Sequence, residues 1–374
     1  MLKSGSEKSV SNYRPISVLS FLSKIFEKCI HIRLVNFLSQ NKILSSNQFG
    51  YQVGINTTDA ILDLLDKVYD SLNNKKICVS LFVDLRKAYD TVNHDILLKK
   101  LYRYGVREVV LNLFRSYLTD RIQCVKVGTA ISSPLKITTS VPQGSVLGSI
   151  LFLLYINDLP NVSPQLSTTL FADDTVFTLS HTNDLQLSEI FNSELAKINN
   201  WMKVNRLSLN TTKTFAINFS SRKSNNLENL VINDCRIEWQ TCIRYLGVYI
   251  DKKLSFSNHI SVLCNKISRL VGLIYRISSS LSPQTLRLLY YSLIYPHLIY
   301  GNLIWGGTYN VHINRILVLQ KKIVRLVLSK PYRYPTENLF NQARILRIAD
   351  IHVYVSALYG YSNISSFQQA SYSY

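Results

Sequence analysis

The spacing of hydrophobic residues changes several times along the chain, and each spacing predicts one kind of element. A helical repeat predicts helices over 17–40, 57–74, 94–104, 110–119, 144–158 and 183–204. Short apolar runs predict strands over 76–84, 122–128, 134–139, 168–179 and 214–219, and the run at 168–179 predicts a hairpin. A further turn and strand are expected near 245–251, and beyond residue 252 the pattern is mostly helical.

Two of these helices have a well-defined apolar stripe, which we expect to be buried. In 17–40 it comprises Phe26, Ile30, Leu34 and Leu38, reinforced by Ile25 and Phe37, with Ser17 or Ser20 as the cap. In 183–204 it comprises Leu187, Ile190, Phe191, Leu195, Ile198 and Trp201 or Met202.

The order of elements from the strand at 76–84 onward is strand, helix, hairpin, helix, strand. This is the split βαβ pattern of an α+β domain, into which the elements at 122–139 and 144–158 are inserted. The pattern brings the end of the first strand beside the tip of the hairpin. Residues far apart in the sequence, Asp84 and the pair Asp173-Asp174, are therefore expected to meet.

These three carboxylates suggest a metal site. A lone Asp-Asp pair is more often a polar hairpin tip, but here apolar strands flank it on both sides, and buried charges need a cationic partner. Two divalent cations about 3.5–4 Å apart, bridged by carboxylates, form the usual centre for nucleotidyl transfer. We therefore expect Asp84, Asp173 and Asp174 to be metal ligands.

The charge indicates a polyanionic partner. The 42 Lys and Arg residues against 23 Asp and Glu residues give a net charge of +19. Residues 252–374 hold 14 of the basic residues and only two acids, Glu337 and Asp350. Binding to a phosphate backbone is the usual reason for such a bias. A merely solvated basic face is the alternative, and an anionic membrane is a weaker one because no basic amphipathic helix stands out.

The cysteines, the N-terminal segment and the longest uncharged stretch indicate the cellular compartment. The six cysteines have neither zinc-ligand nor disulfide spacing, which favours a reducing compartment. No signal-peptide pattern is found. The uncharged stretch 288–306 contains Pro296, His297 and Asn302, so we expect buried helices there and not a transmembrane span. The expected location is the nucleus or cytoplasm, with no membrane and no obligate protein partner.

Seven motifs in order resemble the reverse transcriptases of non-LTR (LINE-type) retrotransposons, nearest to the jockey-like branch. The motifs are Asn12-Tyr13-Arg14-Pro15-Ile16-Ser17 through Lys28, Gln48-Phe49-Gly50-Tyr51, Phe82-Val83-Asp84-Leu85-Arg86-Lys87-Ala88-Tyr89-Asp90, Val141-Pro142-Gln143-Gly144-Ser145-Val146-Leu147-Gly148, Phe171-Ala172-Asp173-Asp174, Leu209-Asn210-Thr211-Thr212-Lys213-Thr214 and Tyr245-Leu246-Gly247. The stretch from Leu289-Tyr290-Tyr291-Ser292 to Gly301 is similar to the family's thumb. The resemblance implies a right-hand polymerase with fingers (about 1–75), a ferredoxin-like palm (76–251) and a basic helical thumb or connection region (252–374).

The resemblance also implies an activity and its ligands. The chain would extend a DNA primer, or target DNA, with dNTPs on an RNA template. Asp84 and Asp173 would bridge two Mg²⁺ ions, which Mn²⁺ could replace. Asp174 would support the site, and Leu85 would offer its backbone carbonyl.

Further site residues follow from the same motifs. Tyr89 would lie under the incoming sugar and exclude a 2′-hydroxyl, or else be a packed core tyrosine. Gln143 would hydrogen-bond the incoming nucleotide, and Gly144 would let the template base pair approach the backbone. Lys213 would act near the pyrophosphate as cation or general acid, unless it is an exposed lysine at a strand end. Arg14 would contact phosphate, or be a solvated surface arginine.

Two segments are expected to hold the nucleic acid. Tyr245, Leu246 and Gly247 would hold the primer end, or form an ordinary turn before a strand. Lys321, Lys322 and Arg325 would share one side of a helix and contact the duplex, while Ile323, Leu326 and Val327 pack inward. The alternative is that these cations only keep the lobe soluble.

The chain departs from the family at four positions. Gln52 and Ile55 replace expected arginines, Ser140 stands where glycine usually precedes Val141-Pro142, and Ser149 replaces a usual proline. The family's endonuclease and its cysteine-rich knuckle are also missing, as expected for a truncated piece of an element. A catalytically silent remnant that only binds nucleic acid is therefore the alternative function. A maturase or telomerase-like enzyme is disfavoured by the first motif and the thumb, and a viral RNA polymerase by Ala172 where glycine is commoner.

Overall fold

The computed structural model describes residues 13, 16–220 and 227–363. It divides into two compact units, Met1–Gln240 and Thr241–Tyr374. The boundary lies between residues 240 and 241, whereas the motifs place the end of the palm at 251. The segment with Tyr245, Leu246 and Gly247 is therefore part of the second unit.

The first unit combines six helices with one larger sheet and three short strand pairs among its described residues. The helices are α1 (Phe21–Gln40), α2 (Thr57–Asn73), α3 (His94–Arg103), α4 (Glu108–Leu118), α5 (Val146–Ile156) and α6 (Asp184–Val204). The sheet contains β1 (Ile77–Val83), β6 (Ser167–Phe171), β7 (Asp174–His181), β8 (Phe215–Asn218) and β11 (Glu238–Trp239). The short pairs are β2 (Ile122–Gln123) with β5 (Leu135–Lys136), β3 (Lys126–Val127) with β4 (Ala130–Ile131), and β9 (Val231–Ile232) with β10 (Cys235–Arg236).

The sheet confirms the predicted α+β palm pattern. Its strand order is β11-β8-β1-β7-β6, and β1 pairs antiparallel with both β7 and β8. The order β8-β1-β7-β6, with a helix after β1 and another after the β6–β7 hairpin, is that of a ferredoxin-like split βαβ unit. The end of β1 consequently lies beside the tip of the hairpin, as the sequence predicts.

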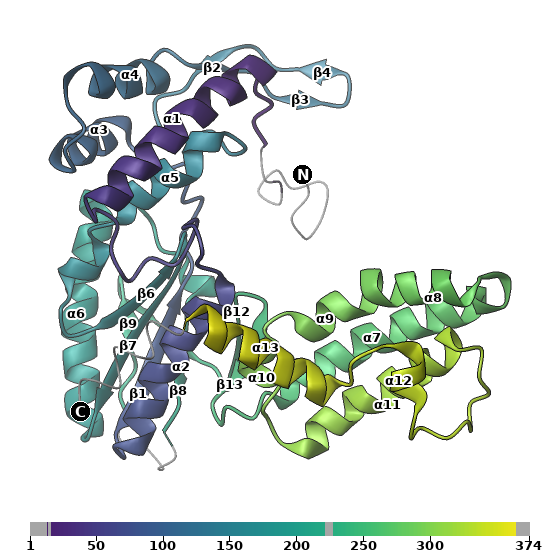
Figure 1. Ribbon diagram of the computed structural model, residues 1–374. Coiled ribbons are helices and arrows are strands. Elements are labelled where there is room, and N and C mark those ends of the chain that lie inside the picture. The colour runs from purple at the N-terminus through teal and green to yellow at the C-terminus, as the bar shows by residue number, and fades with distance from the viewer. Residues whose placement is uncertain (1–12, 14–15, 221–226, 364–374) are drawn as a thin grey trace. The chain divides into compact units, whose positions relative to one another are not determined.

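Helices cover both faces of this sheet. Every residue of β1 is buried, which requires cover on both sides. Val79 and Leu81 belong to one core cluster with α6 residues such as Phe191, and the alternate residue Ser80 faces the other side. Helix α2 packs on β1, β6 and β7, and its capping box at Asn56 and Asp59 fixes its first turn (Figure 1).

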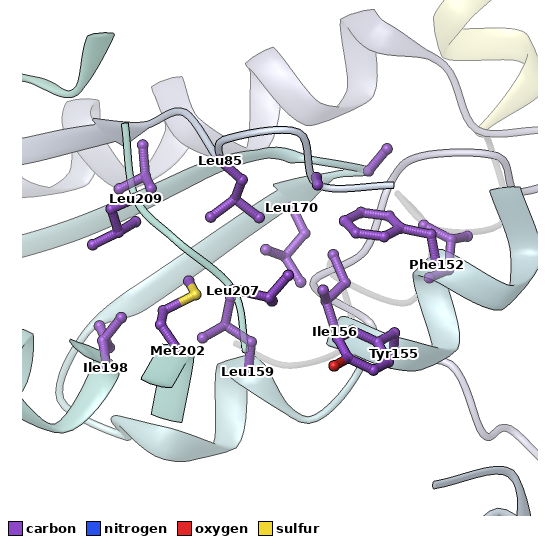
Figure 2. Packing of buried hydrophobic residues seen from close by; sticks show 14 of the residues in the cluster. Leu85, Phe152, Tyr155, Ile156, Leu159, Leu170, Ile198, Met202, Leu207 and Leu209 are labelled. Carbon is purple, nitrogen blue, oxygen red and sulfur yellow. The ribbon is translucent and has the colours of Figure 1, made fainter. Parts of the chain in front are cut away.

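The core continues under the hairpin and anchors the segments that follow the strands. Figure 2 shows Leu85, from the segment after β1, in the same cluster as Leu170 of β6 and Met202 of α6. Phe152 and Tyr155 of α5, which is buried along nearly its whole length, extend the cluster. The predicted stripe of α6 is confirmed at Leu187, Phe191, Leu195, Ile198 and Met202, whereas Ile190 and Trp201 are only half-buried.

The prediction for α1 was wrong in its first half. The helix begins at Phe21 with Ser20 as its cap, and Leu34 and Leu38 are buried as expected. Ile25 and Phe26, however, are 47% and 58% exposed. The reason is that Glu27 occupies the buried side of this end of the helix, at 1% exposure.

The insertion at 122–139 also differs in detail from the prediction. Two regular strands were expected, but the segment forms two nested pairs of two-residue strands, and all eight residues are exposed. An exposed two-stranded ribbon has no core side to enforce a long ladder, which explains its irregularity.

The second unit begins with a hairpin and is otherwise helical, as predicted. The hairpin is β12 (Cys242–Tyr245) and β13 (Val248–Asp251). The helices are α7 (Ser257–Ile277), α8 (Pro283–Leu289), α9 (Tyr295–Ile299), α10 (Asn302–Trp305), α11 (Asn310–Val327), α12 (Leu339–Ala343) and α13 (Ile348–Ser362), and a π-helical turn (Tyr290–Ile294) joins α8 to α9. Within 288–306 the expected buried packing is found at Tyr290, Ile294, Leu298 and Trp305. No helix in the described part of the chain is long and apolar enough to cross a membrane.

Candidate active site

The strand register places Asp84 next to the hairpin that carries Asp173 and Asp174. The last pair of the β1–β7 ladder joins Val83 to Thr175. One step further along the same antiparallel register, Asp84 comes opposite Asp174. The β6–β7 ladder closes at Phe171 and Asp174, so Ala172 and Asp173 are the two residues of the turn. The three acidic positions thus share one edge of the sheet.

The hairpin tip is supported by the buried side chain of Gln48. Its Oε1 accepts hydrogen bonds from the backbone N–H of Ala172 at 3.1 Å and from that of Gly50 at 2.8 Å. Ala172 has φ +55°, a left-handed conformation that exposes its N–H to this contact. A Cβ on Gly50 would lie 2.6 Å from the Ala172 nitrogen, so only glycine allows this approach. The second fingers motif therefore fixes the turn that carries Asp173.

Asp84 is held from the other side by Asn210. The side-chain amide of Asn210 donates to Asp84 Oδ2 at 2.8 Å, and its backbone N–H donates to the carbonyl of Asp84 at 2.8 Å. Arg86 N–H donates to the carbonyl of Ser208 at 2.8 Å, and Leu85 and Leu209 form a β-bridge. The segment after β1 is consequently tied to the segment before β8.

Lys213 lies on the short 3₁₀ turn Thr211–Lys213 that follows Asn210, and it is exposed. Its backbone N–H donates to the carbonyl of Asn210 at 3.0 Å. Asn210 thus connects the backbone of Lys213 to Asp84, with one hydrogen bond to the lysine and others to the aspartate. This placement agrees with a cation near the carboxylates, and its action on pyrophosphate stays a prediction.

The metal assignment is supported by backbone positions and not by side-chain geometry. Among residues 13, 16–220 and 227–363, no three His, Cys, Asp or Glu side chains lie together as a metal-binding group. The expected ligands are the carboxylates of Asp84, Asp173 and Asp174 with the carbonyl of Leu85, and their binding of a metal stays a prediction. Oxygen donors of this kind suit Mg²⁺. Asp84 is half-buried, which leaves part of its carboxylate accessible to a ligand.

The predicted nucleotide-binding residues of the fourth motif lie in the loop before α5. Gln143 is engaged within the protein, since its Nε2 donates to Asp90 Oδ1 at 2.7 Å. Gly144 has φ +108°, and a Cβ there would lie 3.2 Å from the carbonyl of Ser17. Glycine is therefore required at 144 by the fold, in addition to any approach of a base pair.

Tyr89 is expected either to lie under the incoming sugar or to pack in the core, and its surroundings have features of both. Its ring stacks on Phe152 of α5, with centroids 4.6 Å apart and planes 28° apart. This contact is what a packed core tyrosine makes, but the side chain is only half-buried. The selection of the sugar by Tyr89 therefore stays a prediction.

Four of the remaining first-unit predictions concern departures from the family. Gln52 donates its side-chain amide to the carbonyl of Gln48, and Ile55 is 37% exposed, so neither supplies the cation that an arginine would. Ser140 has φ +93°. Ser149 lies in the first turns of α5, where serine is accommodated without strain. Arg14 lies outside the described residues.

In the second unit, Leu246 and Gly247 form the turn of the β12–β13 hairpin. Their φ values are +42° and +83°, as a two-residue hairpin turn requires. Tyr300 supports the turn by donating its hydroxyl to the carbonyl of Leu246 at 2.7 Å. Tyr245 is 4% exposed, so its side chain packs inside the unit and only the turn itself offers surface to a primer.

The helix α11 has the expected inward face, whereas its basic face is only partly exposed. Ile323 and Val327 are buried, whereas Leu326 is half-buried. Lys321 and Lys322 are half-buried as well. Arg325 donates its Nε to the carbonyl of Tyr334 at 3.1 Å, and its guanidinium lies 5.9 Å from the Tyr332 ring centre. Arg325 therefore holds a neighbouring loop, and its expected alignment with the two lysines as a duplex contact is not supported.

Sequence reasoning did not assign a function to Gln48 or Asn210, although both lie in quoted motifs. Their common signal is an amide side chain placed beside an acidic strand end. An uncharged amide can donate to a carboxylate or to a backbone without changing its charge. The sequence spacing of Gln48 and Asn210 does not distinguish them from surface residues.

Comparison with known proteins agrees with these motifs. The model of the family "Reverse transcriptase (RNA-dependent DNA polymerase)" matches residues 3–250. The chain is 28% identical over 351 residues to a probable RNA-directed DNA polymerase from transposon X-element of Drosophila melanogaster, covering 92% of this chain and 38% of that protein. It is 30% identical over 349 residues to one from transposon BS of the same species, covering 87% and 37%. The chain thus spans less than two-fifths of the length of these relatives. Telomerase from Candida albicans, solved with a fragment of telomeric RNA, is similar with a TM-score of 0.48 and 13% identity, over 87% of this chain and 59% of that chain.

Proposed function

Because the chain belongs to the reverse transcriptase family, on the branch of non-LTR retrotransposons, we propose that it extends a DNA primer with dNTPs on an RNA template. The observation that carries this proposal is the register that brings Asp84 opposite Asp174, at the hairpin turn that contains Asp173. A pair of β-strands with acids at this edge is what nucleotidyl transfer needs, because the reacting phosphate must be held by cations.

Reverse transcriptases use divalent metal ions, and two Mg²⁺ ions, or Mn²⁺ in their place, would activate the primer hydroxyl and stabilise the leaving group. Asp84, Asp173 and the Leu85 carbonyl would hold these ions, and Asp174 would support the arrangement. The primer 3′-hydroxyl loses its proton to solvent as its oxygen forms a bond to the α-phosphorus of the dNTP, and the bond from that phosphorus to the oxygen it shares with the β-phosphate breaks, so that pyrophosphate leaves. Lys213 donates a proton to the departing pyrophosphate.

The other residues of the site select the nucleotide. Tyr89 lies under the sugar and excludes a 2′-hydroxyl. Gln143 binds the incoming nucleotide after its side-chain amide gives up the hydrogen bond to Asp90. Basic side chains of the second unit contact the phosphate backbone of the template, the primer and the target DNA, as does the Leu246-Gly247 turn. Such contacts do not depend on the base sequence.

The alternative is a silent copy that binds nucleic acid without extending it. It draws support from Gln52 and Ile55, where the family usually has arginines, so the grip on the triphosphate is weaker. The intact carboxylates disfavour it. A weaker grip is expected to raise the KM for dNTP and to leave catalysis in place.

The test is primer extension on poly(rA)/oligo(dT) with Mg²⁺ by the full chain. Extension is expected for the natural sequence and for Asp70→Asn, which changes an exposed aspartate on α2. Asp84→Asn and Asp173→Asn are expected to abolish extension while the proteins remain folded, because removing one acid from a like-charge group relieves repulsion. If either variant extends primers at the natural rate, the proposal is wrong. If the natural chain binds the duplex but extends nothing, the silent alternative is correct.

A further inference from the structure

Asn210 makes hydrogen bonds both to Asp84, after β1, and to the turn that carries Lys213, before β8. Toward β1, its Nδ2 donates to Asp84 Oδ2 at 2.8 Å and its backbone N–H donates to the Asp84 carbonyl at 2.8 Å. The side-chain bond orients the Asp84 carboxylate, the backbone bond holds the chain at Asp84, and neither bond involves Oδ1. An amide is a neutral donor, so it orients the carboxylate without cancelling the charge that a cation needs.

Toward β8, the same residue organises the turn that carries Lys213. Its Oδ1 accepts a hydrogen bond from Thr212 Oγ1 at 2.8 Å. Its carbonyl accepts from the Lys213 N–H at 3.0 Å and from Thr214 Oγ1 at 2.9 Å. Four hydrogen bonds beyond the one to the Asp84 carboxylate therefore hold Asn210 in place, and its planar side-chain amide bonds Asp84 through Nδ2 and Thr212 through Oδ1.

We propose that Asn210 is a positioning residue that couples the orientation of the Asp84 carboxylate to the position of the Lys213 turn. This inference rests on the proposed function. In that reaction Asp84 acts where the new bond forms and Lys213 acts where the old bond breaks. A single rigid residue between them keeps the distance between the two ends of the reaction constant, which matters because small displacements of catalytic groups are costly.

The simpler explanation is that Asn210 only stabilises the turn before β8. The two explanations differ in what the loss of each contact does. If Asn210 only stabilises the turn, replacing it lowers thermal stability and does not change the affinity of Asp84 for cations. If it positions Asp84, replacing it weakens cation binding even where the fold is intact.

The experiment measures Mn²⁺ binding to the full chain by the EPR signal of free Mn²⁺, together with primer extension over a range of Mg²⁺ concentrations. Asn210→Ala is expected to weaken Mn²⁺ binding and lower kcat by about 10- to 100-fold, as is usual for partners of metal ligands. Thr212→Val removes one of the three bonds between Asn210 and the turn and leaves both bonds to Asp84 in place, so it is expected to lower kcat and leave Mn²⁺ affinity unchanged. Asn199→Ala is the control, because Asn199 is a half-buried asparagine of α6 whose side chain also makes a hydrogen bond, to Asn233, away from Asp84.

The outcomes separate this inference from the proposed function. If Asp84→Asn is inactive but Asn210→Ala keeps the natural Mn²⁺ affinity and kcat, only the coupling is refuted. If Asp84→Asn extends primers normally, the proposed function fails. If the natural chain binds no Mn²⁺, the coupling is refuted as well, since Asp84 then has no cation to be positioned for. Asn210→Leu, which keeps the side-chain volume, replaces Asn210→Ala if the latter does not fold.

Discussion

The buried carboxylate of Glu27, on α1, accepts a hydrogen bond from the backbone N–H of Val146, the first residue of α5, at 2.6 Å. The N–H of Leu147 lies 3.4 Å from the same oxygen, and the hydroxyl of Tyr117 donates to the other oxygen at 3.2 Å. The first N–H groups of a helix have no partner within it, and the positive end of its dipole favours an anion. The fingers helix thereby fixes the start of α5, directly after the loop that carries Gln143.

Glu27→Ala is expected to lower the free energy of unfolding by about 2 kcal/mol, because buried N–H groups and a hydroxyl lose their acceptor. Chemical denaturation of the full chain measures it. The control is Glu189→Ala, an exposed glutamate of α6, for which we expect a change of less than about 0.5 kcal/mol. Equal effects in the two variants would show that the Glu27 contacts contribute nothing.

Ser140 is the family departure that has a structural consequence. Its φ of +93° is a conformation that glycine adopts readily and that a residue with a Cβ adopts at a cost. Its backbone bonds, to the Val92 carbonyl and from His94 Nε2, are independent of its side chain. Ser140→Gly is therefore expected to raise the free energy of unfolding by about 1 kcal/mol.

The control for that change is Ser145→Gly. Ser145 has φ −79° and its hydroxyl accepts from the Gly148 N–H at 2.9 Å as the cap of α5. The same substitution is expected to be slightly destabilising there. If Ser140→Gly is also destabilising, the backbone at 140 is not strained.

The palm could be predicted from the sequence because its signals are local and repeated. The strands at 76–84 and 168–179 are apolar runs of sufficient length, and α6 has a helical stripe over its whole extent. The two-residue strands β9, β10 and β11 were not predicted, because so few residues produce no periodicity. The exposed side of α1 was misjudged because hydrophobicity alone does not reveal that a buried glutamate takes the place of an apolar residue.

The site could be predicted only as far as charge and motif reach. Asp84, Asp173 and Asp174 are acids at strand ends, and the topology brings their backbones together. The amides that hold them, Gln48 and Asn210, act through contacts across 124 and 126 residues of sequence, which no local pattern contains. The bond from Arg325 to Tyr334 spans only nine residues, but its acceptor is a backbone carbonyl in a loop, which no residue pattern identifies.

The two lysines of α11 are expected to contact phosphate, and Arg325 is not. Lys321→Ala/Lys322→Ala should reduce the slope of log affinity against log salt by about 0.9 for each lost contact on B-form DNA, with a similar change for a hybrid. Arg325→Ala should leave that slope unchanged and lower stability, because the Tyr334 carbonyl loses its donor. Binding of the full chain to a primer–template duplex from low to moderate salt measures the slope. An unchanged slope for the double variant would place the contacts elsewhere in the second unit.

His259 is expected to make stability depend on pH. Burial beside Trp305, whose ring centre is 5.5 Å away, lowers the pKa of His259 to about 4. The unfolded chain, with a histidine pKa of about 6.5, then binds more protons than the folded one between these values. Stability is therefore fully present above about pH 6.5 and is lost progressively as the pH falls toward 4, by up to roughly 3 kcal/mol.

His259→Phe should remove this loss, so that unfolding at pH 5 and pH 7 differs less than in the natural chain. Trp305 fluorescence can report the event, since that indole is buried against the imidazole. His181→Gln, which changes a half-exposed imidazole at the end of β7, is the control. The same acid sensitivity in His259→Phe as in the natural chain would assign the loss to other groups.

Tyr89 allows the selection of sugar to be tested apart from packing. Tyr89→Ala removes the ring that is proposed to exclude the 2′-hydroxyl, so the ratio of dNTP to rNTP incorporation is expected to fall by about tenfold or more. It also removes the stacking on Phe152, which costs about 1 kcal/mol of stability. Tyr89→Phe keeps the ring and should retain the natural selectivity. Phe152→Leu removes the stacking partner alone, so it should lower stability with a smaller change in selectivity. If Tyr89→Ala and Phe152→Leu lose stability equally and both keep the natural dNTP preference, Tyr89 is a core residue and the sugar is selected by another group.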